Sequence, residues 1–118
     1  MARILVVDDE QNMGRAMRWE LKGHEVHICN SREAACEQLS HQKFDAVICD
    51  WNLGEHETGE GVLATAARLN AGARRFIVSG VVPDGLASLL VAGVAHRYIA
   101  KPWRPHEVRE VVGQELGG

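Results

Sequence analysis

The chain has 118 residues, a formal net charge of −3 and a hydrophobic fraction of 46%, which suits one globular domain over residues 1–118 of ordinary composition. No segment is long and apolar enough to span a bilayer, and the apolar start runs directly into acidic residues, so we expect neither a membrane protein nor a secreted one. Basic residues form no run that would bind nucleic acid directly, so another domain or a partner would have to contact any DNA. We expect the chain to be cytoplasmic.

Short apolar runs alternate along the chain with segments of helical periodicity. Most runs are nearly continuous, as in strands that helices cover on both faces, but residues 24–29 alternate polar and apolar as at a sheet edge. In chain order we predict strand 3–7, helix 11–22, strand 24–29, a helix capped by Ser31, strand 44–49, a helix with its apolar stripe at 62–69, strand 76–78, a helix capped by Asp84, strand 98–100 and a helix opened by Pro105. This alternation predicts a doubly wound α/β fold with a parallel sheet and right-handed crossovers.

Three cysteines, Cys29, Cys36 and Cys49, are an odd number without the C-x-x-C spacing of a zinc site. Neither a disulfide framework nor a structural metal is indicated. We expect buried, reduced thiols, in agreement with a cytoplasmic location.

Most of the predicted buried strands end at a polar or charged side chain. Asp8 and Asp9 follow the first strand, Asp50 the third, Ser79 the fourth and Lys101 the fifth. In a sheet of this kind, ligands bind outside the carboxyl ends of the strands, where the strand order reverses. We therefore expect these five side chains to share one pocket although they are far apart in sequence.

A pocket with three carboxylates indicates a bound cation, because like charges held together make ionisation costly. Mg²⁺ suits a small open site with oxygen ligands, since it takes one or two carboxylates and keeps several waters. Lys101 would hold an incoming phosphoryl group as a point charge, and the Ser79 hydroxyl would donate to a phosphate oxygen. Asp50 would then act as an in-line nucleophile and become an aspartyl phosphate.

Together these residues resemble the response-regulator receiver domain of bacterial two-component systems, over essentially the whole chain. The matching motifs are Asp8-Asp9, Cys49-Asp50-Trp51-Asn52, Ser79-Gly80 and Lys101-Pro102. The second of them is similar to the corresponding stretch of the chemotaxis regulator. The resemblance implies a flavodoxin-like (βα)5 fold, with a five-stranded parallel sheet in the order 2-1-3-4-5 and helices on both faces.

The resemblance also implies a phosphorelay role. Asp50 would accept a phosphoryl group from a histidine kinase or a histidine phosphotransfer protein. Asp9, Asp50 and the backbone carbonyl of Asn52 would ligate Mg²⁺, and Asp8 would act mostly through water. The domain would be no turnover enzyme, but it would assist its own aspartyl phosphorylation and dephosphorylation.

A switch follows from the same resemblance. Ser79 would turn toward the phosphoryl group, and Tyr98 would move inward behind it. The change would alter the face formed by the fourth helix, the fifth strand and the fifth helix, where an output domain or a second copy would bind. The Lys101-Pro102 peptide bond is expected to be cis, as in the family.

The segment after Asp50 departs from the family pattern. It is longer than usual, so that Gly59 and Gly61 are the nearest matches to the glycine that relatives carry there. The inserted region is acidic, with Glu55, His56, Glu57 and Glu60. Together with Val81, which with Asn52 flanks the path of an attacking water, it would change the lifetime of the phosphorylated form.

Other interpretations remain open for individual residues and for the whole chain. An Asp-Asp pair alone is more often a helix-capping turn than a metal site, Tyr98 alone suits an ordinary strand aromatic, and Trp19 and Trp51 suit partner contacts. A binding module of the same fold would signal without phosphorylation. A phosphohydrolase of the haloacid-dehalogenase kind would need a second aspartate two residues after the nucleophile, where this chain has Asn52.

Overall fold

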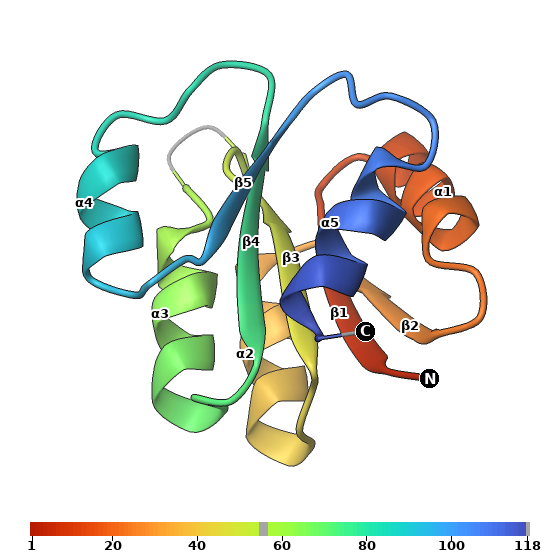
Figure 1. Ribbon diagram of the computed structural model, residues 1–118. Coiled ribbons are helices and arrows are strands. Elements are labelled where there is room, and N and C mark those ends of the chain that lie inside the picture. The colour runs from red at the N-terminus through yellow and green to blue at the C-terminus, as the bar shows by residue number, and fades with distance from the viewer. Residues whose placement is uncertain (55–56, 118) are drawn as a thin grey trace.

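A parallel β-sheet with helices on both faces forms the molecule (Figure 1). The computed structural model describes residues 1–54 and 57–117; Glu55 and His56, part of the acidic segment noted above, lie outside the described residues, as does Gly118. Strands and helices alternate through the described ranges in the order β1(Arg3–Val7), α1(Gln11–Glu20), β2(Glu25–Cys29), α2(Arg32–His41), β3(Ala46–Asp50), α3(Glu60–Leu69), β4(Arg74–Ser79), α4(Leu86–Val91), β5(Arg97–Ala100) and α5(Glu107–Glu115).

The sheet has the order β2-β1-β3-β4-β5, and all four neighbouring pairs are parallel. This confirms the doubly wound fold and the strand order that the resemblance implied. The strand order reverses between β1 and β3, so the carboxyl ends of these central strands are the expected place for a ligand.

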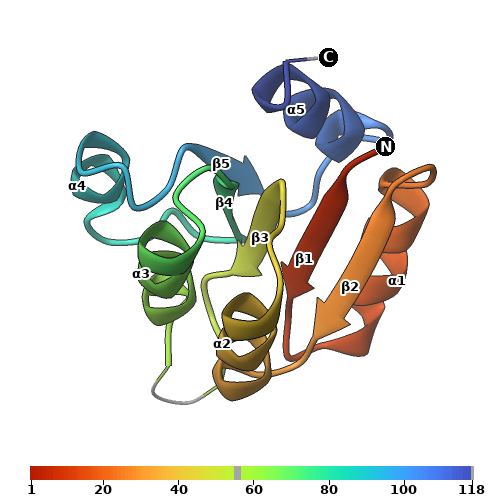
Figure 2. The same ribbon diagram turned by 90° about the horizontal axis from the view of Figure 1, so that it is seen from below.

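Helices lie on both faces of the sheet (Figure 2), and an apolar core fills the space between the sheet and the helices on each face. Successive strand residues point to opposite faces, so Leu5 and Val7 pack under α2, α3 and α4, whereas Ile4 and Val6 pack under α1 and α5. Strands buried on both faces must be apolar throughout, which explains the continuous runs in the sequence.

The predicted starts of the last two helices are wrong. Gly85, and not Asp84, precedes α4, and no side chain caps that helix. Pro105 lies in the loop, and α5 begins two residues later, after a left-handed His106. Both helices follow left-handed residues, which the capping and proline rules do not anticipate.

The three cysteines are free thiols, as predicted, although Cys36 is only half-buried and donates weakly to Thr65 Oγ1. Within the described ranges, no helix is long and apolar enough to cross a membrane.

Candidate functional site

The strand ends bring the predicted residues together because the backbone ladder continues beyond the strands. The N–H of Asp8 donates to Cys29 O at 2.9 Å, and the N–H of Lys101 donates to Ser79 O at 3.0 Å. These bonds extend the sheet by one residue, so the backbone of Asp8 and of Lys101 is held by the neighbouring strands. The Lys101-Pro102 bond is cis, as expected.

An acidic cluster lies at this edge of the sheet. Asp8, Asp9 and Asp50 each offer a carboxylate oxygen, and these oxygens lie within 4.8 Å of one another. Asp8 and Asp50 are buried, at 2% and 3% exposure, whereas Asp9 is exposed. Three carboxylates at these separations match the donor set that a hard divalent cation prefers.

Asp8 is the group that most needs a cation. Its Oδ1 accepts from the N–H of Glu10 at 3.1 Å, but its buried Oδ2 has no hydrogen-bond partner among the described residues. Burial, with a smaller contribution from the neighbouring Asp50, raises the pKa of Asp8 to about 7. A divalent ion would satisfy the free oxygen and favour the ionised form.

Asp50 is held by two different donors. Lys101 Nζ lies 2.9 Å from Asp50 Oδ2, in an ion pair whose carboxylate is 5% exposed. The backbone N–H of Asn52 donates to the other oxygen, Oδ1, at 3.2 Å. Both carboxylate oxygens therefore have fixed directions, which is what an in-line nucleophile requires.

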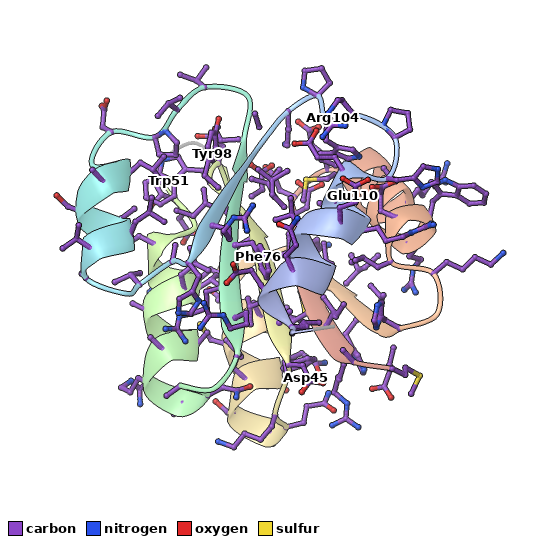
Figure 3. The ribbon with its side chains drawn as sticks, in the orientation of Figure 1. Asp45, Trp51, Phe76, Tyr98, Arg104 and Glu110 are labelled. Atoms are coloured by element: carbon purple, nitrogen blue, oxygen red, sulfur yellow. The ribbon has the colours of Figure 1, made fainter. Side chains whose placement is uncertain are left out.

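Ser79 is buried at the end of β4, and its hydroxyl is already bonded within the following loop. Its Oγ donates to Val81 O at 2.6 Å and accepts from the N–H of Val81 at 3.3 Å. The hydroxyl of the half-buried Tyr98 donates to Ser79 O at 3.0 Å. Figure 3 shows Tyr98 and Trp51 near the carboxyl ends of the strands, on the side of the sheet where α4 lies.

The segment after Asp50 folds back on itself. Asn52 and Thr58 pair in an antiparallel bridge, with hydrogen bonds from Leu53 N to Glu57 O and from Gly59 N to Trp51 O. A Cβ on Gly59 would lie 2.8 Å from Asp50 O, so this glycine, and not Gly61, closely approaches the candidate acceptor.

Sequence reasoning missed Glu20, a buried acid at the end of α1 that accepts hydrogen bonds from the start of α5. The sequence offered one signal: Glu20 lies next to Leu21, which together with Met17 forms the inward face of the predicted helix, so the acid could have been expected near the core. Of the two suggested contact residues, Trp19 is exposed and Trp51 is half-buried.

Comparisons with known proteins identify the family of the chain. The family model described as the response regulator receiver domain matches residues 4–113. The hydrogenase transcriptional regulatory protein HoxA of Bradyrhizobium diazoefficiens is 34% identical over 116 residues, covering 96% of this chain and 24% of that protein. The alginate biosynthesis transcriptional regulatory protein AlgB of Pseudomonas putida is 34% identical over 118 residues, covering 97% of this chain and 26% of that protein.

The chain thus spans about a quarter of the length of these curated relatives. Among solved structures, a CheY-like receiver domain protein from Methanospirillum hungatei JF-1 superposes with a TM-score of 0.89 at 24% identity, covering 99% of this chain and 94% of that one. This likeness supports the fold.

Proposed function

The chain belongs to the response regulator receiver domain family of two-component systems, and on that basis we propose that it is a phosphorylation switch whose acceptor is Asp50. The observation that carries the proposal is the Lys101 ammonium 2.9 Å from an Asp50 carboxylate within a cluster of three acids. A structural ion pair between Lys101 and Asp50 would not explain why Asp8 and Asp9 lie beside it.

The residues that would hold Mg²⁺ are Asp9, Asp50 and the carbonyl of Asn52, with Asp8 nearby. The unpartnered Oδ2 of Asp8 and the high pKa of that group support this assignment, because both disfavour the ionised cluster unless a cation is bound. When bound, the ion would neutralise phosphoryl oxygens during transfer.

Transfer from a phosphohistidine would form one bond and break one. A carboxylate oxygen of Asp50 attacks phosphorus while the P–N bond to the donor imidazole breaks, and the electron pair stays on the ring nitrogen. Lys101 would exchange its contact with Asp50 for one with a phosphoryl oxygen. The ionised Asp50 carboxylate carries no proton, so the attack requires no general base. The residues of the chain contribute by positioning the reacting groups and by offsetting their charge.

The donor would be a histidine kinase or a histidine phosphotransfer protein. An open groove beside Lys101 offers such a protein an apolar surface. It lies between α1 and the segment after β5 and is lined by Glu10, Met13, Ala16, Lys101, Pro102 and Trp103. A protein seated there would have its phosphoryl group next to the Asp50–Lys101 pair.

The output would pass through Ser79. Turning its hydroxyl toward a phosphoryl oxygen requires breaking the bond to Val81 O, which frees the loop before α4. Tyr98, bonded to the Ser79 carbonyl, would transmit the change to β5. We propose that the α4–β5–α5 face, where Val91 is 90% exposed, then binds an output domain or a second copy. The relatives named above are transcriptional regulatory proteins, and we therefore infer that the output of this switch is the control of transcription.

The experiment is incubation with Mg²⁺ and acetyl phosphate, followed by intact mass measurement before and after hydroxylamine. The wild type should gain one hydroxylamine-labile phosphoryl group, and Asp50→Asn should gain none. A wild type without adduct would instead indicate a binding module that signals without phosphorylation.

Rapid release of phosphate from many small esters would indicate a hydrolase, which Asn52 disfavours. We accordingly propose a cytoplasmic switch, and not a turnover enzyme, that assists its own phosphorylation and dephosphorylation. The free cysteines suit a reducing compartment.

A further inference from the structure

The start of α5 lacks a cap of its own. His106 precedes the helix, and its side chain makes no capping bond. The first N–H groups of a helix have no partner within the helix and must find one elsewhere. At this end of α5 the partner comes from a different helix.

Glu20, the last residue of α1, provides that cap. Its carboxylate accepts from the N–H of His106 at 3.0 Å, of Val108 at 3.0 Å and, more weakly, of Arg109 at 3.5 Å. In return, the Arg109 side chain donates to Glu20 O at 3.1 Å. Each helix thus caps the other, and Glu20 is only 3% exposed.

Glu20 also holds a strained residue. His106 has φ 69°, and among residues 1–54 and 57–117 it is the only non-glycine residue with a positive φ. Such a conformation persists only where the surroundings enforce it. One of the bonds that enforce it is the one from the His106 N–H to Glu20.

The segment from Lys101 to His106 connects this cap to the candidate active site. At one end the Lys101 N–H donates to Ser79 O, and at the other His106 donates to Glu20. Pro102 and Pro105 lie between and fix their own φ angles, which makes the segment stiff as well as short. A shift of the α5 end is therefore transmitted toward the lysine.

We propose that Glu20 is a positioning residue for Lys101, acting through the segment 101–106. It touches no reacting atom. Its role is to keep the ammonium within reach of Asp50 and of the phosphoryl group, because a displacement of an ångström at such a contact slows a reaction markedly. The proposal rests on the proposed phosphorylation of Asp50.

The test compares two acids that anchor opposite ends of α5. Glu20→Gln removes the negative charge and replaces one of the two acceptor oxygens by an NH₂ group, which cannot accept, so the bond from either the His106 or the Val108 N–H is lost. Glu115→Gln is the matched control, because Glu115 binds Arg74 and Arg97 at the far end of the same helix. Each variant is to be incubated with acetyl phosphate at saturating Mg²⁺, and the rate of adduct formation is compared with that of the wild type. The Mg²⁺ affinity of each variant is measured separately.

We expect Glu20→Gln to lower the rate about tenfold with unchanged Mg²⁺ affinity, and Glu115→Gln to keep the wild-type rate within about twofold. If Glu20→Gln does not fold, Glu20→Asp takes its place, since it keeps the charge and loses reach. A variant of Glu20 that reacts at the wild-type rate overturns the proposal. Failure of the wild type to form any adduct would instead overturn the proposed function.

A double-mutant cycle separates positioning from general destabilisation. In a Lys101→Ala background the ammonium is absent, so adding Glu20→Gln should cause no further loss of rate. Equal losses in both backgrounds would show that Glu20 does not act through Lys101, and would overturn the proposal. If Lys101→Ala reacts too slowly to measure, the contrast between the Glu20 and Glu115 variants decides.

Discussion

Gly59 is the residue whose substitution should disturb the site most directly without removing any functional group. Its φ of −69° is open to any residue, so the demand for glycine is steric and not conformational. A Cβ at this position would lie 2.8 Å from Asp50 O and 3.0 Å from Cys49 Sγ. Real Cβ atoms do not approach backbone so closely, and Asp50 O cannot retreat because β3 is paired on both sides.

We expect Gly59→Ala to destabilise the protein by about 2 kcal/mol, within the range for overpacking a buried site. The lower chain entropy that alanine brings to the unfolded state roughly offsets its poorer capping of α3. For a domain of this size the melting temperature should fall by about 7 °C. Because the clash involves the backbone of the proposed acceptor, adduct formation by acetyl phosphate should also slow.

Gly61→Ala is the matched control, measured by the same thermal unfolding and phosphorylation assays. A Cβ there would meet only the Arg32 side chain, at 3.2 Å, which can move. Since Gly61 lies within α3, alanine should stabilise the helix by about 0.5–1 kcal/mol and leave the rate unchanged. If Gly59→Ala melts and reacts like the wild type, the close approach to Asp50 does not constrain the site.

The remaining predictions concern charge and hydrogen bonding. Because the pKa of Asp8 is about 7, Mg²⁺ affinity measured by calorimetry should strengthen as pH rises from 6 to 8; an affinity independent of pH would contradict the raised pKa. The pKa of Asp8 in the folded protein lies above its unfolded value of 3.8, so the metal-free protein should lose stability as the pH rises from about 4 to about 7. This loss is at most about 4 kcal/mol, and Asp8→Asn should remove it. Arg75→Met should cost about 3 kcal/mol in urea unfolding, since the buried guanidinium donates to four backbone carbonyls that would be left without it; a loss below 1 kcal/mol would refute that role. Tyr98→Phe should cost about 1 kcal/mol, the bond to Ser79 O, and an unchanged stability would show that this bond contributes nothing.

The parts of the site that follow strands could be predicted from sequence because local pattern determines them. A strand covered on both faces must be apolar, so the first polar residue after it marks its carboxyl end. Asp8, Asp50, Ser79 and Lys101 were found in this way. Their convergence then follows from the parallel sheet alone, without any knowledge of contacts.

The parts that sequence did not predict depend on contacts between distant segments. The cap of α5 is Glu20, 86 positions before the His106 N–H that it binds. Helix-start rules consider only neighbouring residues, so they pointed to Pro105 and could not identify Glu20. Similarly, β4 begins at Arg74, before the apolar run, because Arg74 pairs with Glu115 of α5 and Arg75 binds carbonyls of neighbouring loops. These partners offset the cost of placing two arginines in a strand that helices cover.

The charges of the site indicate why phosphorylation would move Ser79. Three ionised carboxylates and one ammonium leave two negative charges, which one divalent cation balances. A phosphoryl group on Asp50 replaces a single charge with about two, so the balanced site gains a negative charge that metal and lysine no longer offset. The Ser79 hydroxyl is a neutral donor at the end of β4, but it is occupied by Val81 O at 2.6 Å. A charged acceptor forms the stronger hydrogen bond, and the exchange of partners would therefore release the loop before α4.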